Sequence, residues 1–321
     1  MKYYLSVLLM LLVISQATSQ DLPKTFKYEF GFRSDNDSYL AGGQDQYYTN
    51  GLLLNFRIAL DQSKLGNKKL NKMVLEFEAG QKIYNPLTGR IFNIVKIDRP
   101  FAGYLYAGAA LNLLYNSENN LKLSLQTGTI GPSALAKEAQ KILHSALGFY
   151  GIKGWQWQVK NEFAINASAE YNYLLNRSTT GKVDFAANTY VNIGNTFSGA
   201  GAGIMFRAGA INPLFNSAVT QSRVSKNAPE KNIVKKEFFF YAKPMLHYIA
   251  YDATIQGGLF IQDKGPAVFE VKPVVFSQQA GAIYSQNRFT ADFSILFKTR
   301  EVKSNAGPHK YGSIALYYRF N

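Results

Sequence analysis

The amino-acid sequence predicts an all-β fold, a 12-stranded antiparallel transmembrane β-barrel with a short helix in an extracellular loop. Tyr (21) and Phe (23) are abundant, and apolar side chains alternate with polar or small ones, as in strands that face lipid on one side. Residues 1–19 resemble an export signal, with Lys2, an apolar run over 5–14 and small residues at 17–19. After them no apolar stretch approaches the roughly 20 residues that a membrane helix needs. We therefore expect a signal peptide at 1–19 and one barrel over 20–321, in the bacterial outer membrane.

Composition narrows the classes of chemistry and of partner. The chain has no cysteine, which excludes disulfides and thiolate metal sites, and its 47% hydrophobic content excludes disorder. A net charge of +14 favours anionic partners. The export signal argues against nucleic acid, so lipopolysaccharide phosphates are the anions we expect, with a basic surface that has no dedicated partner as the alternative.

The strands follow from the alternation, which is clearest at the C-terminal end. Ile314, Leu316 and Tyr318 share one face with Phe320, in the position of the terminal aromatic residue of outer-membrane barrels. The segments with this pattern are 27–34, 48–60, 71–84, 101–116, 120–130, 155–175 (one long strand or a hairpin), 182–194, 198–210, 235–252, 269–285, 288–302 and 311–320. Twelve is an even number, as closure of an antiparallel barrel requires.

Three segments depart from this period. Pro244 and Pro273 lie inside two expected strands, and each marks a bulge or a misplaced boundary, because proline cannot donate to a ladder. The stretch 133–147 contains neither Gly nor Pro and is rich in Ala, Leu, Lys, Glu and Gln, which predicts a helix with Ser133 as its cap. Such a helix has to lie outside the hydrocarbon or inside the lumen.

Strand parity then groups the connections. With both termini in the periplasm, the connections after odd-numbered strands face the exterior. The segments 34–47, 85–100 and 131–154 follow the first, third and fifth strands, so we expect them to converge at one exterior mouth. The long basic stretch 211–234 falls on the periplasmic side, where the sequence assigns it no role.

The first of these connections carries clustered oxygen donors. Asn36 and Asp37 are followed by the run from Asp45 to Gly51, which includes Thr49. Carboxylates and amides at the top of a strand can bind a hard cation such as Ca²⁺. The same residues are also ordinary turn formers that cap their own backbone, and the spacing alone favours this alternative.

The other two connections supply a candidate base and candidate anion ligands. Within the expected helix, Gln140 and His144 are four residues apart and share a face, and imidazole suits proton transfer near neutral pH. A structural role is the more common one for a lone helical histidine. The cations Arg90, Lys96 and Arg99 could hold phosphates or pair with Asp98, and Trp155 and Trp157 are expected in an interfacial aromatic girdle.

Together these motifs resemble the lipid A 3'-O-deacylase (LpxR) family. They occur in the family's order, over roughly 26–175, as Asn36-Asp37, Tyr48-Thr49-Asn50-Gly51, the block from Asp98 to Tyr104, Gly131-Pro132, Gln140-x-x-x-His144 and Gly154-Trp155-x-x-Gln158. The resemblance implies a twelve-stranded outer-membrane barrel that hydrolyses an ester-linked acyl chain of lipid A with a divalent cation, for which we expect Ca²⁺.

The resemblance also implies roles for individual residues. His144 would be the general base that activates water, and Gln140 would position groups beside it. Asn36, Asp37 and Thr49 would build the metal and oxyanion region, with Asn36 and Asp37 as metal ligands. From the residues themselves, and not from the resemblance, we expect Arg90, Lys96 and Arg99 to bind the substrate.

Two departures from the family pattern concern the substrate more than the reaction. Tyr150 stands six positions after His144, where the family's characterised deacylase carries a catalytically implicated acidic residue, and Glu162 is the candidate to replace it. An adjacent basic pair of the second loop is replaced by the three separated cations.

Three functions therefore remain at the sequence level. The first is a lipid A acyl-ester hydrolase, a monomer whose partners are lipopolysaccharide and outer-membrane lipid. The second is a non-catalytic barrel, either a porin or a lipid-binding protein. The third is an outer-membrane phospholipase, although the sequence has no G-x-S-x-G motif.

Overall fold

The computed structural model describes residues 25–40, 45–61, 69–226 and 233–321. The expected signal peptide lies outside the described residues, so its cleavage stays a prediction. No helix in these four ranges is long and apolar enough to cross a membrane.

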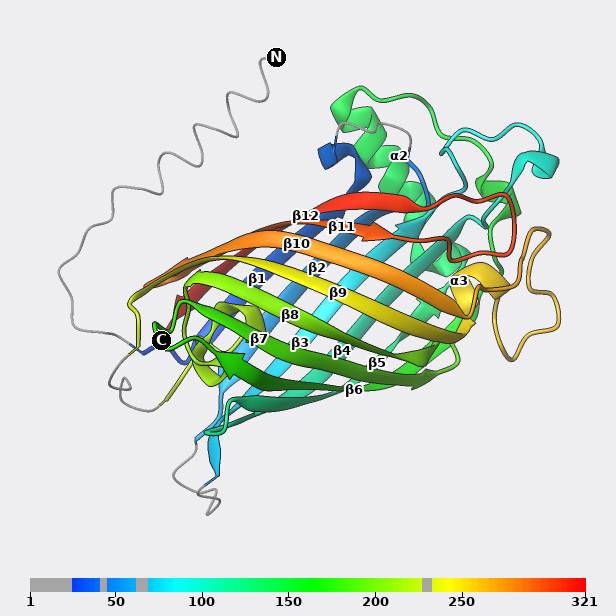
Figure 1. Cartoon of the computed structure of the whole chain (residues 1–321). Coiled ribbons are helices and arrows are strands. Elements are labelled where there is room, and N and C mark those ends of the chain that lie inside the picture. Colours follow the sequence, from blue (N-terminus) through cyan, green and yellow to red (C-terminus); the bar gives the residue numbers. More distant parts are fainter. Residues whose placement is uncertain (1–24, 41–44, 62–68, 227–232) are drawn as a thin grey trace.

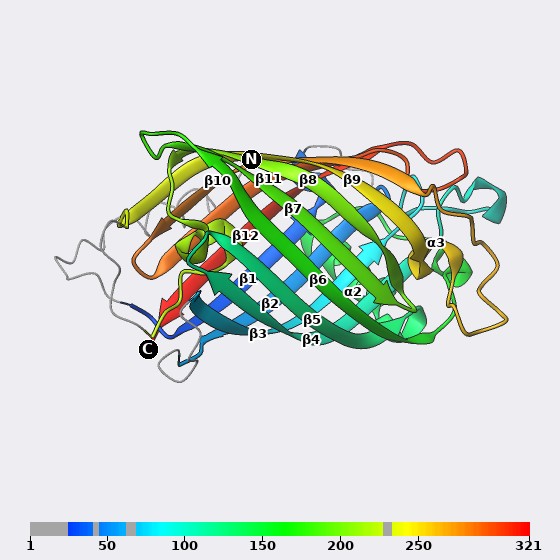
Figure 2. The same ribbon diagram turned by 60° about the horizontal axis from the view of Figure 1, so that its bottom comes forward.

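Twelve antiparallel strands form one closed barrel, as predicted (Figures 1 and 2). β1 pairs with β2 on one side and with β12 on the other, so every strand has two neighbours. The strands are β1 (Tyr28–Asn36), β2 (Tyr48–Ala59), β3 (Leu70–Tyr84), β4 (Ala102–Tyr115), β5 (Asn119–Ile130), β6 (Glu162–Arg177), β7 (Val183–Gly194), β8 (Phe197–Ala210), β9 (Lys236–Asp252), β10 (Val274–Gln286), β11 (Phe289–Lys298) and β12 (His309–Phe320).

The two faces of the barrel wall differ in chemistry as the alternation predicts. On β1, Phe30 and Phe32 are exposed on the outer face, whereas Glu29 points inward and is buried. Inside, the Arg57 guanidinium bridges the carboxylates of Glu29 and Glu76. Paired charges of this kind are tolerated in an interior because each satisfies the other's hydrogen-bonding groups. The barrel thus has an apolar exterior and a polar lumen.

Two expected strands, 155–175 and 269–285, start too early, and a third, 235–252, is irregular at Pro244. Residues 155–157 form a 3-10 helix, η5 (Trp155–Trp157), so β6 begins at Glu162. β10 begins directly after Pro273, which is a boundary, as its missing N–H suggested. Pro244 lies inside β9, and the ladder to β8 is interrupted beside it, between the pairs Gly203–Met245 and Phe206–Ala242.

The predicted helix exists but starts later. α2 (Ala136–Leu147) follows a 3-10 turn, η4 (Pro132–Ala134), and Leu135 rather than Ser133 is its N-cap, in a left-handed conformation. The reason is Pro132, which favours the first position of a helical turn and so places the tighter turn before the helix. A second short helix, α3 (Ala253–Gln256), follows β9.

The described part of the basic stretch after β8, residues 211–226, folds into the end of the barrel that carries the C-terminus (Figure 1). Its short helices η6 (Leu214–Asn216) and η7 (Ala218–Thr220) pack against inward side chains of several strands. Leu214 joins Met205 in one cluster, and Val224 joins Leu114 in another. We call residues 211–226 the inner segment. It gives this stretch the structural role that the sequence left open.

Candidate active site

The connections after β1, β3 and β5 converge at one rim of the barrel, opposite the inner segment (Figure 1). Asp45 comes from the β1–β2 connection, Gly89 from the β3–β4 connection, and His144 and Tyr150 from the β5–β6 connection. The predicted convergence is therefore confirmed, and the exterior position of this rim stays a prediction. Because strand order fixes which end a loop occupies, parity brings these loops to one end of the barrel, and the tertiary structure then places Asp45 and His144, 99 positions apart, in contact.

α2 lies on the outside of the barrel wall, not in the lumen. Lys82 of β3 lines the lumen, so its chain neighbours Gln81 and Ile83 face outward. Gln81 Nε2 donates to the carbonyl of Ala134 (2.7 Å), at the start of the helix. A small apolar core forms there outside the barrel from Ile83, Ile91, Ile97, Phe101, Ala136, Trp155 and Ala267.

The imidazole of His144 is held at the end of α2 by the chain that follows it. Gly148 takes a left-handed conformation and ends the helix, and the Phe149 amide donates to the His144 carbonyl (2.8 Å). This reversal places the Tyr150 carbonyl 2.7 Å from His144 Nδ1. A carbonyl only accepts, so Nδ1 is the nitrogen that donates in this contact, and Nε2 is the nitrogen left to exchange a proton.

His144 Nε2 faces a carboxylate that sequence reasoning did not place beside this histidine. Asp45 places Oδ2 at 3.1 Å and Oδ1 at 3.3 Å from Nε2. The Tyr150 hydroxyl donates to Asp45 Oδ2. Burial and this hydrogen bond raise the pKa of Tyr150, so the phenol stays a donor at neutral pH. The only signal in the sequence was the membership of Asp45 in the polar cluster before β2.

Gly89 allows this packing. A Cβ at Gly89 would lie 3.0 Å from Asp45 Oδ2 and 3.1 Å from both Gln140 Nε2 and the Tyr150 hydroxyl. A side chain there would push these polar groups apart. The polar groups of Asp45, Gln140 and Tyr150 therefore all lie around the Cα of Gly89.

Asp37 and Thr49 adjoin Asp45, as the first-loop motif suggested. Thr49 Oγ1 lies 3.2 Å from Asp37 Oδ1 and 3.3 Å from Asp45 Oδ1, so its hydroxyl donates to one carboxylate at a time. The Gln46 amide donates to Asp37 Oδ2 (2.6 Å). Burial, with the nearby charge of Asp45, raises the pKa of Asp37 to about 6.

Gln140 lies in the same group and retains an unused donor. Its Oε1 accepts from Trp155 Nε1 (2.9 Å), which fixes the orientation of the amide. Its Nε2 is buried and has no hydrogen-bond partner among the described residues. A buried donor without a partner costs about 1–3 kcal/mol, so a ligand oxygen that accepts from it would be favoured. Trp155 thus supports Gln140 from a buried position and does not belong to an interfacial girdle.

Comparison with known proteins identifies the family. A model of the family "Outer membrane protein LpxR" matches residues 4–320. The chain belongs to the LpxR family. LpxR from Salmonella typhimurium is 20% identical, with a TM-score of 0.71, and the match covers 91% of this chain and 100% of that chain. The resemblance stated from the motifs is confirmed, and with it a location in the bacterial outer membrane.

Other solved barrels are similar only in general architecture. The β domain of the Bordetella autotransporter BrkA is 10% identical with a TM-score of 0.47, covering 92% of this chain and 100% of that chain. The translocator domain of the autotransporter NalP from Neisseria meningitidis is 9% identical with a TM-score of 0.42, covering 99% and 96%. A search of curated proteins found no match.

The oxygen donors of the first loop fit a hard cation in part. Asp37 is a buried carboxylate beside a second acid, Asp45. The Asn36 side-chain oxygen accepts from the Ser38 amide (2.7 Å), so it serves the turn that was the alternative reading. No group of three or more His, Cys, Asp or Glu side chains within the described ranges could hold a metal. A cation here would need neutral oxygen donors such as Thr49, which Ca²⁺ accepts.

The three loop cations are not brought together. Arg99 is 1% exposed, donates to Thr254 Oγ1 (2.9 Å) and stacks 4.4 Å from the Tyr84 ring, so it is a buried structural residue. Lys96 is exposed at the end of η3 (Ile94–Lys96). Arg90 instead adjoins Lys153 across a backbone bridge, a cation that sequence reasoning missed.

Two acids also differ from the expectations. Asp98 accepts from the Tyr47 hydroxyl and the Leu87 amide, each at 2.9 Å, rather than pairing with a loop cation. Glu162 accepts from Asn195 Nδ2 and from two backbone amides of the β9–β10 connection. It therefore does not replace the missing acid at position 150.

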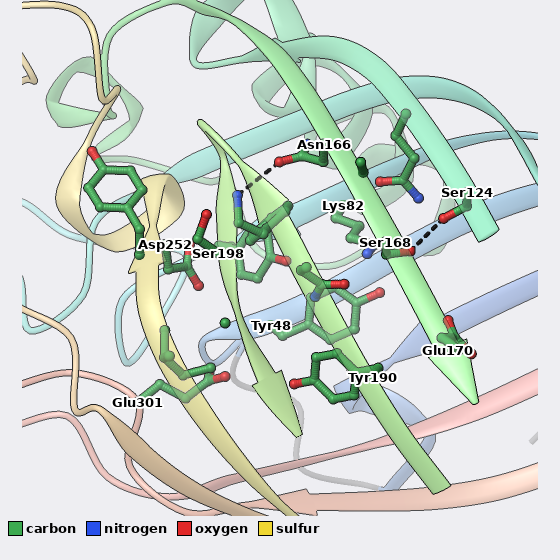
Figure 3. Close-up of a pocket in the computed structure, with 18 of the residues that line it drawn as sticks. Tyr48, Lys82, Ser124, Asn166, Ser168, Glu170, Tyr190, Ser198, Asp252 and Glu301 are labelled. Atoms are coloured by element: carbon green, nitrogen blue, oxygen red, sulfur yellow. Dashed lines mark hydrogen bonds between the residues drawn. The ribbon is translucent and has the colours of Figure 1, made fainter. Parts of the chain in front are cut away.

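A separate polar cavity of about 390 Å³ lies in the lumen (Figure 3). Lys82, Glu170 and Tyr190 are among its lining residues, whereas His144, Asp45 and Asp37 are not. The wall of the barrel therefore separates this cavity from the candidate active site.

Proposed function

We propose that the protein is an outer-membrane lipid A acyl-ester hydrolase of the 3'-O-deacylase type. Family membership supports lipid A deacylation at the level of the family. The observation that carries the proposal for this chain is the orientation of His144. Its Nδ1–H is engaged by the Tyr150 carbonyl, and its Nε2 faces the Asp45 carboxylate.

The proposed reaction is a single hydrolysis in which His144 moves a proton. Nε2 takes a proton from a water molecule while the water oxygen adds to the ester carbonyl. The tetrahedral intermediate then expels the sugar oxygen, which takes the proton from the imidazolium, and a free fatty acid leaves. General base catalysis of this kind typically contributes about 10²–10⁴-fold in rate.

The carbonyl oxygen becomes negative during this attack, and the unused Gln140 Nε2–H is a fixed donor for it. A donor of this kind is worth about 2.7–4 kcal/mol in other hydrolases. Asp37, Thr49 and the remaining acceptor capacity of Asn36 would hold a divalent cation, proposed to be Ca²⁺. When bound, the cation would polarise the ester carbonyl as a Lewis acid.

The position on the outer wall suits an amphiphilic substrate. Below the site, Leu52 and Leu54 of β2 and Phe77 of β3 are exposed on the lipid-facing side. Leu52 pairs with Gln81, the residue that holds the start of α2. An acyl chain could therefore stay against the lipid-facing wall while its ester reaches the polar cluster above. Lipid A, whose acyl chains lie in the outer leaflet, has this arrangement.

The test compares lipid A by mass spectrometry, using purified protein and cells with and without the gene. Loss of one ester-linked chain in the presence of wild-type protein is expected. His144→Ala should abolish it while leaving heat-modifiable electrophoretic mobility intact, and the exposed helix variant Lys141→Ala should remain active. Unchanged lipid A with folded wild-type protein would support a non-catalytic barrel. Release of fatty acid from phospholipid vesicles that lack lipid A would support a phospholipase instead.

A further inference from the structure

We infer that Asp45 is the carboxylate that stabilises the protonated ring of His144, and that Tyr150 is the positioning residue that holds Asp45 there. The inference rests on the proposed function and names two residues of the same site. Together they would take the place of the acidic residue that the characterised deacylase of the LpxR family carries at the position of Tyr150.

The contact between the acid and the base is direct. Both Asp45 oxygens lie within 3.3 Å of His144 Nε2. Nδ1 already donates to the Tyr150 carbonyl, so a proton taken up on Nε2 would make the ring a cation beside an anion. The His144 side chain is only 5% exposed and that of Asp45 15%, so water weakens this attraction little.

Tyr150 holds both partners of the pair. Its main-chain carbonyl engages one nitrogen of the imidazole, and its side-chain hydroxyl donates to Asp45 Oδ2. The Gly89 amide donates to the same hydroxyl (3.3 Å), which completes the chain of hydrogen bonds from the β3–β4 connection. The Tyr150 ring stands edge-on to the imidazole, with centroids 5.0 Å apart and planes at 88°.

This arrangement explains why an aromatic residue can stand where an acid is expected. A glutamate at position 150 would extend about as far as the phenol ring does, so its carboxylate would come near the imidazole. Tyrosine reaches further and ends on Asp45. The negative charge then comes from the β1–β2 connection, and Tyr150 supplies the donor that fixes it.

The experiment measures deacylation of purified lipid A by the full-length protein at saturating Ca²⁺. Asp45→Asn keeps the size of the side chain and removes its charge, and kcat is expected to fall at least 100-fold. Tyr150→Phe removes only the hydroxyl, and a fall of about 10-fold is expected, since a hydrogen bond to a charged group is lost. Glu138 is an exposed acid on α2, the helix that carries His144. Glu138→Gln is therefore the matched control and should retain full activity.

A charge swap separates an electrostatic role from a structural one. In the Asp45→Asn background, Tyr150→Glu restores a carboxylate beside the ring and should raise kcat at least 10-fold. Folding of each variant is checked by heat-modifiable mobility. An Asp45→Asn protein with more than a tenth of wild-type kcat, or a swap variant with no gain, would overturn the inference.

The Ca²⁺ dependence distinguishes Asp45 from a cation ligand. If Asp45 acts on His144, excess Ca²⁺ does not restore the Asp45→Asn variant; restoration by excess Ca²⁺ would overturn the assignment. Failure of the proposed function looks different, because wild-type protein itself would then leave lipid A unchanged.

Discussion

Gly103 of β4 lies directly against Ala136, the first residue of α2. A Cβ at Gly103 would be 2.5 Å from the Ala136 Cβ and 2.9 Å from the Ala134 Cβ. This close approach lets the helix rest on the outer wall of the barrel. The position of His144, two turns further along the helix, therefore depends on the absence of a side chain on a neighbouring strand.

The first prediction follows from this contact. Gly103→Leu should displace the start of α2 from the wall and lower kcat for lipid A deacylation by about 10-fold or more, since small misplacements of reacting groups are costly. The barrel itself should fold, as judged by heat-modifiable mobility. Ala107→Leu, at an exposed outward position of the same strand, is the control and should have little effect. Equal losses in both variants would contradict the role of the Gly103 contact.

The second prediction concerns the support of Gln140. Trp155→Phe removes the indole donor that holds Gln140 Oε1 while keeping an aromatic ring against Phe101, whose centroid is 5.2 Å away. The amide can then rotate, and we expect kcat to fall about 5–10-fold, the equivalent of roughly one hydrogen bond. Trp157→Phe, two residues later, should leave kcat within twofold. Kinetics at saturating lipid A measure the difference.

The third prediction concerns the cation. Removal of divalent cations with EDTA should silence deacylation, and added Ca²⁺ should restore it. Asp37→Asn removes a buried carboxylate, so the Ca²⁺ concentration for half-maximal activity should rise at least 10-fold. Isothermal titration of the folded protein with Ca²⁺ provides a measurement that does not depend on turnover. Full activity of the wild type in excess EDTA would remove the cation from the mechanism.

The fourth prediction separates the loop cations. The side chains of Arg90 and Lys153 flank the ring of Phe92, and their charged groups lie 5.3 and 4.7 Å from its centroid. Replacing either residue by alanine leaves no buried group without its partner. We expect each to raise KM for lipid A several-fold with little change in kcat. Arg99→Ala should instead lower the free energy of unfolding by about 1–3 kcal/mol, because it leaves the buried Thr254 hydroxyl without its donor. A large KM effect confined to Arg99→Ala would reverse this assignment.

The fifth prediction concerns the inner segment. Lys72 donates to Asn216 and to the Ser222 carbonyl, and Asn112 donates to the Thr220 carbonyl, so the segment is tied to the inner wall. Wild-type protein in planar bilayers should therefore show no large steady conductance. Replacing residues 213–224 by a short Gly/Ser linker should open a pore and leave deacylation intact, since the site lies at the other end. A freely conducting wild type would favour the porin alternative.

Much of the fold was predictable because it follows from local rules. Alternation located all twelve strands, and parity placed the odd-numbered connections at one rim. The boundary errors arose where tertiary contacts override the local pattern. Trp155 and Trp157 alternate with glutamines as in a strand, but Gly154 adopts a left-handed conformation and Trp155 is drawn into the core beside α2.

The site was predictable in part for the same reason. Asn36, Asp37, Thr49, Gln140 and His144 came from motifs, and the structure places all of them at one rim. The structure buries Arg99 against Tyr84 and Thr254. These partners are distant in the sequence, so the local pattern around Arg99 could not indicate its burial. The partnership of Asp45 with His144 was also out of reach, since nothing in the local sequence links a loop residue to a helix 99 positions later.

The sequence by itself determined the closed barrel, the end at which its polar loops gather, and the residue types available for hydrolysis. Only the tertiary structure decided that α2 lies outside the wall, that Tyr150 contacts His144 through its carbonyl and Asp45 through its hydroxyl, and that the Asp45 carboxylate lies beside the imidazole. The physical reason is that alternation depends on adjacent residues and parity on the order of the strands, and both can be read along the chain. The choice of partners for a buried imidazole depends on which side chains the closed sheet leaves within hydrogen-bonding distance.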